Sequence, residues 1–381
     1  MLLLTALSLL GWLHLALWRL RPGPFLPELP PPVAWPELLA IVPARDEAET
    51  ITAALGSLLA QDYPGRLRVI LVDDHSSDGT AALARALPDP MLRLEVVAAP
   101  ALPPGWTGKL WAQAAGLAHG QRLAPDARWL LLTDADIVHE PASLRRLVSF
   151  GEARGLDLVS LMALLRCSTA WERLLIPAFV FFFQKLYPFR AVADPASPVA
   201  AAAGGCLLVR ADRLQAAGGL HAVRDRLIDD CALARLVKGR GGAIWLGLTR
   251  TVRSVRAYDG LAPIWAMVAR TAFTQLGHSW TLLAGTVAGM LLLYAVPPLG
   301  ALLLPLLGWP LAGLTALLAW LVMAATYLPT IRLYGLPWRA SLTLPAAAML
   351  YVAMTVDSAR RHGQRIGGGW KGRVYPQGAC R

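Results

Sequence analysis

Two pairs of acidic residues in this chain each follow an apolar run. Asp134 and Asp136 come directly after Trp129–Thr133, and Asp73-Asp74 closes the run that begins at Val69. If both runs are parallel strands, the acids lie at the carboxyl edge of a sheet, where open α/β sheets bind ligands. Carboxylates one residue apart point the same way and can share a hard cation, Mg²⁺ or Mn²⁺, which neutralises a diphosphate. An Asp that merely caps the next helix is the alternative for either pair.

The elements that must position these acids follow from the hydrophobic pattern. Short apolar runs alternate with segments whose apolar residues recur at helical spacing, so we expect a mostly parallel α/β sheet with right-handed crossovers. The expected strands are Leu38–Val42, Leu67–Val72, Leu92–Val97 and Trp129–Thr133. The expected helices are one opened by Asp46, then Thr80–Leu87, Leu110–His119 and Pro141–Ala153.

The composition indicates a membrane protein. The hydrophobic fraction is 56% and the mean hydropathy is +0.48, both above the values of soluble proteins. The net charge of +11 comes almost entirely from Arg, because the chain has only four Lys. These Arg residues lie beside apolar runs and do not alternate with aromatic residues, so nucleic acid is not an expected partner. We expect the lipid bilayer instead.

Apolar runs at both ends predict membrane anchors. Leu2–Trp18 is long enough to cross a bilayer, and Arg19 follows it, which favours an uncleaved anchor with its carboxyl end in the cytoplasm. Further apolar runs are Trp280–Leu307 and Leu311–Tyr327. The expected organisation is an anchor at 1–20, a Pro-rich linker at 21–37, an α/β domain at 38–255, an amphipathic connector at 256–279, a membrane region at 280–358 and a basic cytoplasmic tail at 359–381.

The sequence leaves the placement of two segments undecided. Leu342–Val356 either lies at the interface or re-enters the bilayer, or the Pro297 region hides an extra turn, because three full spans after the α/β domain would place the basic tail outside. The aromatic segment at 171–190 is either an interfacial helix or a buried core helix. The four Cys lack metal-type spacing and are expected to be reduced and structural.

Several motifs in order resemble the family 2 glycosyltransferases of the GT-A fold. Besides the two acid pairs, they are Pro43-Ala44-Arg45-Asp46-Glu47, Gly204-Gly205-Cys206, Gly218-Gly219 and Ile228-Asp229-Asp230-Cys231. With Trp106-Thr107-Gly108-Lys109 and the apolar C-terminal runs, the chain most resembles the bacterial hopanoid-biosynthesis-associated glycosyltransferases. This resemblance implies a protein of the bacterial inner membrane with a cytoplasmic catalytic domain.

The resemblance assigns donor-binding roles to particular residues. The nucleotide sugar would contact Pro43, Arg45, Glu47, Asp73, Asp74, Lys109, Asp134 and Arg270, and Asp134 and Asp136 would hold Mg²⁺ or Mn²⁺. Glu47 could instead be a first-turn acid that favours the helix dipole, and Lys109 an ordinary solvated side chain. His139 is a conceivable third metal ligand, although polar surface is the more common role of such a His.

The resemblance also implies the catalytic step. Asp230, with Asp229 beside it, would take the proton from the acceptor hydroxyl, and one displacement would invert the anomeric centre. Gly204 and Gly205 would let the acceptor approach the backbone closely. The processive Gln-x-x-Arg-Trp motif is absent around Arg270, so we expect a non-processive enzyme. The segment Trp370-Lys371-Gly372-Arg373-Val374-Tyr375 either returns to the catalytic domain or is a plain basic tail.

The function expected from these observations is transfer of a sugar from a nucleotide-sugar donor to a membrane lipid acceptor, in hopanoid or related isoprenoid metabolism. A carotenoid, a sphingolipid or a polyprenyl phosphate is an alternative acceptor. Two other classes of protein are alternatives. One is a nucleotidyltransferase, which would have a Gly-rich loop with basic residues where this chain has Pro43–Glu47. The other is a non-catalytic membrane scaffold with a degenerate domain.

Overall fold

The computed structural model describes residues 1–364, and within them the chain divides into two units. The α/β unit comprises Gly23–Arg166 and Phe189–Ala257. The helical unit comprises Met1–Pro22, Cys167–Pro188 and the residues from Tyr258 onward. The chain therefore passes between the units four times, and the helix of the aromatic segment interrupts the α/β unit in sequence.

An eight-stranded sheet forms the centre of the α/β unit, in the order β3-β2-β1-β4-β7-β6-β8-β5. The strands β1 to β4 pair in parallel, β7 runs antiparallel to β4 and β6, and β5 runs antiparallel to β8. The bounds are β1 Leu38–Ala44, β2 Leu67–Asp73, β3 Leu94–Ala98, β4 Trp129–Thr133, β5 Ile137–His139, β6 Leu158–Leu164, β7 Cys206–Arg210 and β8 Ile244–Ser254.

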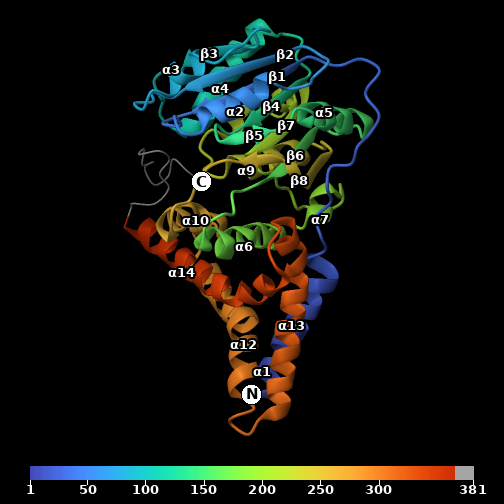
Figure 1. Ribbon diagram of the computed structural model, residues 1–381, viewed down its shortest axis with the longest axis vertical. Helices are drawn as coiled ribbons and strands as arrows, with labels where there is room; N and C mark the ends of the chain where they lie inside the picture. The colour runs from blue at the N-terminus through green and yellow to red at the C-terminus, as the bar shows by residue number, and fades with distance from the viewer. Residues whose placement is uncertain (365–381) are drawn as a thin grey trace. The chain divides into compact units, whose positions relative to one another are not determined.

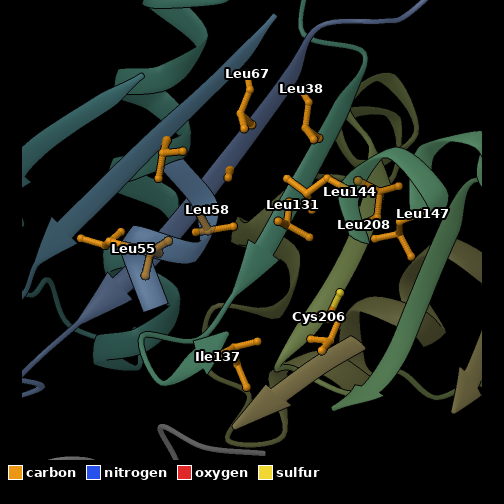
Figure 2. Close-up of a cluster of buried hydrophobic side chains, with 14 of the residues drawn as sticks. Leu38, Leu55, Leu58, Leu67, Leu131, Ile137, Leu144, Leu147, Cys206 and Leu208 are labelled. Carbon is orange, nitrogen blue, oxygen red and sulfur yellow. The ribbon is translucent and has the colours of Figure 1, made fainter. Parts of the chain in front are cut away.

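Helices cover both faces of this sheet, as buried parallel strands require. On one face, Leu38 of β1, Leu131 of β4 and Leu208 of β7 belong to one buried cluster with α2 and α5 (Figure 2). On the other face, α4 packs on β1 and β2. The helices of this unit are α2 Ile51–Leu59, α3 Thr80–Arg85, α4 Gly108–Leu123, α5 Ser143–Ala153, α7 Phe189–Ala193, α8 Ala211–Ala216 and α9 Asp229–Gly239, with a 3₁₀ turn at Leu220–Val223.

Two glycines set how closely α4 lies on the sheet. A Cβ at Gly116 would be 2.5 Å from Val72 Cγ2, and one at Gly120 would be 2.6 Å from Leu39 Cδ2. Neither neighbour leaves room for a side chain, so the glycine spacing places the first turn of α4 against the carboxyl edge of the strands. Lys109 lies in that turn.

The helical unit contains four helices that are long and apolar enough to cross a membrane: Leu2–Arg19, Trp280–Leu303, Pro310–Leu333 and Trp338–Gly363. Within this unit α1, α12 and α13 run side by side, whereas α14 is inclined to them (Figure 1). The bounds are α1 Leu2–His14, α6 Ala170–Leu186, α10 Leu261–Gln275, α11 Trp280–Met290, α12 Val296–Leu303, α13 Pro310–Leu333 and α14 Leu344–Gly363, with π-helical turns at Leu15–Arg19 and Leu291–Ala295 and a 3₁₀ turn at Trp338–Thr343.

The expected α/β sheet with apolar helices at both ends is confirmed. An extra turn near Pro297 is not formed, because α11, the π-helical turn and α12 continue one another through Val296. Most of the aromatic segment forms one helix, α6, which continues through Pro177 and ends at Leu186, whereas Phe189 and Arg190 begin α7. A capping box between Thr169 and Glu172 starts α6. Tyr351 of α14 donates a hydrogen bond to Leu175 O of α6 at 2.9 Å, so α6 packs inside the helical unit.

Element boundaries differ from the expected ones for local reasons. The helix expected from Asp46 begins only at Ile51, because Asp46 has a positive φ of 51° and bonds the loop after β2. The helix expected from Pro141 begins at Ser143. Three Cys within the described residues, Cys167, Cys206 and Cys231, are free thiols. Trp370–Tyr375 and Cys380 lie outside the described residues.

Candidate active site

The loops after β1 and β2 are fixed to each other at the carboxyl edge of the sheet. Arg45 Nη1 donates to Asp74 O at 2.7 Å, and Asp46 Oδ1 accepts from Ser77 N at 2.8 Å. The adjacent Glu47 N donates to the Thr80 hydroxyl at 2.8 Å. Because β1 and β2 are parallel and in register, both loops leave the sheet at the same level. Pro43 is the last residue but one of β1, in register with Val72 of β2.

Three acids from two separate segments gather around Lys109. Its ammonium lies 2.8 Å from Asp134 Oδ1, at the end of β4, and 3.3 Å from Asp229 Oδ2, in the first turn of α9. Asp230 lies beside this pair, because a Cβ at Gly204 would meet both its Oδ2 and Lys109 Nζ, and the charge of Asp230 contributes to the raised pKa of Lys109. Lys109 is largely buried, so its interpretation as a solvated side chain is wrong.

Asp230 is held by backbone hydrogen bonds. Its Oδ2 accepts from Gly204 N at 2.8 Å and its Oδ1 from Cys231 N at 2.7 Å. A Cβ at Gly204 would lie 3.2 Å from Lys109 Nζ and 3.4 Å from Asp230 Oδ2, so glycine leaves this approach open. At Gly205 a Cβ would lie 3.0 Å from the side chain of Ile137, so a larger residue would crowd this neighbour.

The pKa values in this cluster are perturbed. Burial raises the pKa of Asp230 to about 6, and the charge of Asp229 adds to the rise. Burial raises the pKa of Asp134 as well, although the Lys109 charge opposes the rise. For Lys109, burial alone lowers the pKa, but the charges of Asp134 and Asp229 outweigh it, and the net direction is upward. Lys109 is therefore a cation at neutral pH.

Arg256 forms a second ionic contact that no sequence pattern indicated. Its Nη2 donates to both oxygens of Glu47, at 2.7 and 2.6 Å, and its Nε donates to Asp136 Oδ2 at 3.2 Å. The same oxygen of Asp136 accepts from Ser254 Oγ at 2.6 Å. Glu47 therefore does not act as a first-turn helix acid. It joins the loop after β1 to Asp136 through Arg256.

Asp134 and Asp136 fit the ligand set of a hard divalent cation. One oxygen of each carboxylate is held, by Lys109 and by Ser254 with Arg256, while the second oxygen accepts no hydrogen bond from the described residues. Two oxygen ligands suit Mg²⁺ or Mn²⁺ only when others come from a substrate. Within residues 1–364, no group of three or more His, Cys, Asp or Glu side chains could hold a metal ion by itself.

Not every expected residue joins this cluster. His139 is 2% exposed, its Nε2 contacts the Thr133 hydroxyl at 3.1 Å, and burial lowers its pKa to about 4, so it is a neutral core residue and not polar surface. Asp73 Oδ1 accepts from Ser76 N at 3.3 Å and turns the loop after β2. Arg270 is an exposed residue of α10 in the helical unit, and its contact with a diphosphate stays a prediction.

The family of the chain follows from a match over residues 36–273 to the family described as "Glycosyltransferase like family 2". The chain belongs to this family. It is a glycosyltransferase of the family 2 type, and its α/β unit has the GT-A fold. The hopanoid-specific resemblance is not established by this match.

Two known proteins are similar to this chain. The succinoglycan biosynthesis protein ExoO of Rhizobium meliloti (strain 1021) is 35% identical over 133 residues, which is 33% of this chain and 35% of that protein. The chain thus spans about a third of the length of this relative. The mannosyltransferase PcManGT from Pyrobaculum calidifontis, in complex with GDP-Man and Mn²⁺, matches 93% of this chain and 99% of its own with a TM-score of 0.52 and 21% identity, which is a likeness of fold.

Proposed function

We propose that this glycosyltransferase moves one sugar from a nucleotide sugar to a membrane lipid, with inversion at the anomeric carbon and Asp230 as the general base. The observation that carries the chemistry is the cluster of Asp134, Asp229 and Asp230 around Lys109, beside the donor loop that Arg256 ties to Asp136. The loops after β1 and β2, with Arg45, Asp73 and Asp74, are the proposed site for the nucleotide.

In this proposal each side chain acts on a defined atom. Asp230 accepts the proton of the acceptor hydroxyl as its oxygen attacks the anomeric carbon, and its two backbone hydrogen bonds hold the carboxylate in one orientation. Lys109 gives a fixed positive charge for the diphosphate that leaves. Asp134 and Asp136 would hold Mg²⁺ or Mn²⁺, which supplies the positive charge that makes the diphosphate a better leaving group. PcManGT, of the same fold, was solved with GDP-Man and Mn²⁺.

A lipid acceptor is favoured by how the chain is tethered. The α/β unit is connected at four points to a unit that holds four candidate spans. A soluble acceptor would not require such anchoring. Arg19 and Arg21 follow the first span and Arg332 ends the third, which supports a bacterial inner membrane protein with its α/β unit in the cytoplasm.

The acceptor is proposed to be a hopanoid or a related isoprenoid lipid, on the resemblance of the whole chain. The likeness of one third of the chain to a succinoglycan biosynthesis protein favours a second candidate, sugar addition to a lipid-linked intermediate of a polysaccharide.

The test is incubation of the purified full chain with a panel of nucleotide sugars and a membrane lipid extract, followed by mass spectrometry of the lipids. Asp230→Asn is the inactive control, expected to bind donor and to lose about 10²–10⁴-fold in turnover. Asp225→Asn, in the loop before α9, is the matched control and should keep activity. New glycolipids that require Asp230 support the proposal. Donor hydrolysis without any glycolipid, or a glycosylated soluble glycan instead, contradicts the lipid acceptor.

A further inference from the structure

We propose that Lys185 and Arg19 form a binding site in the helical unit for the phosphate group of a membrane lipid. The inference goes beyond the transferase reaction and does not depend on the identity of the acceptor. It concerns residues of the helical unit alone.

The ammonium of Lys185, near the end of α6, lies among uncharged side chains. Its Nζ is 3.3 Å from the hydroxyl of Tyr294 and 3.7 Å from the sulfur of Met290. It is 5.0 Å from the ring centroid of Tyr294 and 6.0 Å from that of Phe182. In the part of the chain that the structure describes, Lys185 forms no ion pair. Aromatic faces stabilise such a cation but do not neutralise it.

Arg19 brings a second positive charge to the same place. Its Nε donates to Lys185 O at 2.8 Å and its Nη2 to Leu186 O at 3.2 Å, which caps the carboxyl end of α6. Burial and, to a smaller extent, the charge of Arg19 together lower the pKa of Lys185 to about 8. At pH 7 the ammonium is therefore still mainly charged, and the two cations repel each other.

The acidic residues of the described helical unit do not pair with Lys185 or Arg19. Glu172 caps the opposite end of α6, and Asp357 of α14 pairs with Arg360 and Arg361. The contacts of the described residues place Asp259, in the segment before α10, at neither cation. An unpaired cation beside membrane-spanning helices is costly and marks a functional site.

Two consecutive prolines explain why the backbone near this site departs from a regular α-helix. Pro297 and Pro298 lack N–H groups, so carbonyls of the preceding turn lose their helical donors. Ser8 and Trp12 of α1 donate instead to Leu292 O at 2.8 Å and Leu293 O at 2.6 Å. The turn widens into the π-helix that holds Tyr294, and Arg19 ends the other π-helical turn. Such turns occur often at functional sites.

A phosphate monoester or diester on a lipid matches this set of groups. Its oxygens would accept from the ammonium and the guanidinium, and the partly exposed ring of Phe182 would contact its apolar part, while the buried Tyr294 hydroxyl holds the ammonium in place. Arg19 ends the first candidate span, which is the level of lipid headgroups. A bulk anionic phospholipid and a polyprenyl monophosphate share this chemistry.

The experiment measures lipid binding to the purified full chain in detergent micelles, by titration with phosphatidylglycerol, with a polyprenyl monophosphate, with diacylglycerol and with inorganic phosphate. Both lipid phosphates should bind the wild type, and the tighter of the two identifies the source. Lys185→Met should weaken that binding by about tenfold to a hundredfold, the usual effect of removing a charge-assisted hydrogen bond. Arg332→Gln, an exposed residue of α13, is the matched control and should bind as the wild type does.

Two further variants test the proposal if Lys185→Met does not fold. Lys185→Arg keeps the charge and should keep binding, whereas Arg19→Gln, at an exposed position, should weaken binding by about tenfold. The proposal is overturned if folded Lys185→Met or Arg19→Gln binds both lipid phosphates as tightly as Arg332→Gln does. The proposal is also overturned if the wild type binds diacylglycerol as tightly as phosphatidylglycerol. It is overturned as well if inorganic phosphate alone competes for the site as strongly as the lipid phosphates do.

Discussion

Arg256 is predicted to hold the loop after β1 and the carboxylate of Asp136, a proposed metal ligand, together, and Arg256→Gln removes that link. The guanidinium makes three short contacts, two to Glu47 and one to Asp136, whose side chains are only 8% and 11% exposed. Losing one partner of a fully buried ion pair costs about 3–5 kcal/mol. Because the Arg256 side chain is itself 31% exposed, water compensates in part, and we expect a loss of about 2 kcal/mol.

The assay is thermal unfolding of the full chain in detergent, with Arg145→Gln as the control. Arg145 pairs with Asp62 at 2.8 Å, but both side chains are well exposed, so its loss should cost less than about 1 kcal/mol. At about 2–4 °C per kcal/mol for a domain of this size, Arg256→Gln should lower the melting temperature by about 4–8 °C. The Arg256→Gln, Glu47→Gln double variant should lose less than the two single variants together, because each single variant leaves a charge unpaired.

Binding gives an independent readout of the same link. We expect nucleoside diphosphate to bind Arg256→Gln about tenfold more weakly in the presence of Mn²⁺, since loss of one charged contact has that order of effect. Equal melting temperatures and equal nucleotide affinities for Arg256→Gln and Arg145→Gln would show that this network neither stabilises the α/β unit nor organises the donor site.

Three other perturbations test the site and the fold. Asp136→Asn should abolish the metal dependence of donor binding while the unit still folds, and a wild type whose nucleotide affinity is unchanged by a chelator contradicts the metal assignment. The transfer rate should fall as the pH drops through about 6, because the Asp230 base must be ionised; in Asp229→Asn this limb should move to lower pH, since the Asp229 charge raises the pKa of Asp230. Gly116→Ala should destabilise the chain by about 1–3 kcal/mol in thermal unfolding, because the new Cβ meets Val72 at 2.5 Å, whereas Gly56→Ala of α2, with nothing within 4 Å, should be neutral or stabilising.

The sequence predicted the parts of this structure that depend on local pattern. The strand Trp129–Thr133 has its predicted bounds because five consecutive apolar or β-favouring residues are buried on both faces. The acids after β4 and at the start of α9 were predicted from motif order, and the structure brings both to Lys109. Parallel strands that end at one edge make such gathering predictable, even across about a hundred residues.

Long-range pairing was the part that the sequence could not supply. Arg256 follows β8, at the start of the segment expected to be an amphipathic connector, and its partners lie 209 and 120 positions away. His139 carries no local sign of burial, yet the pairing of β5 with β8 encloses it. Similarly, no motif marks Lys185, because its site depends on how α1 and α6 meet the turn before Pro297.

The charges at the sheet edge explain why a cation is expected with the donor. Among the residues that the structure describes, five carboxylates, those of Glu47, Asp134, Asp136, Asp229 and Asp230, lie with two cationic side chains, Lys109 and Arg256. Even with Asp230 protonated, the negative charges exceed the positive ones, and a nucleotide diphosphate would add to the excess. Because unscreened like charges repel strongly in a partly buried site, an added divalent cation is the simplest way for this edge to accept the donor. The same excess explains why Lys109 stays protonated, and it predicts that Lys109→Met weakens donor binding even when metal is saturating.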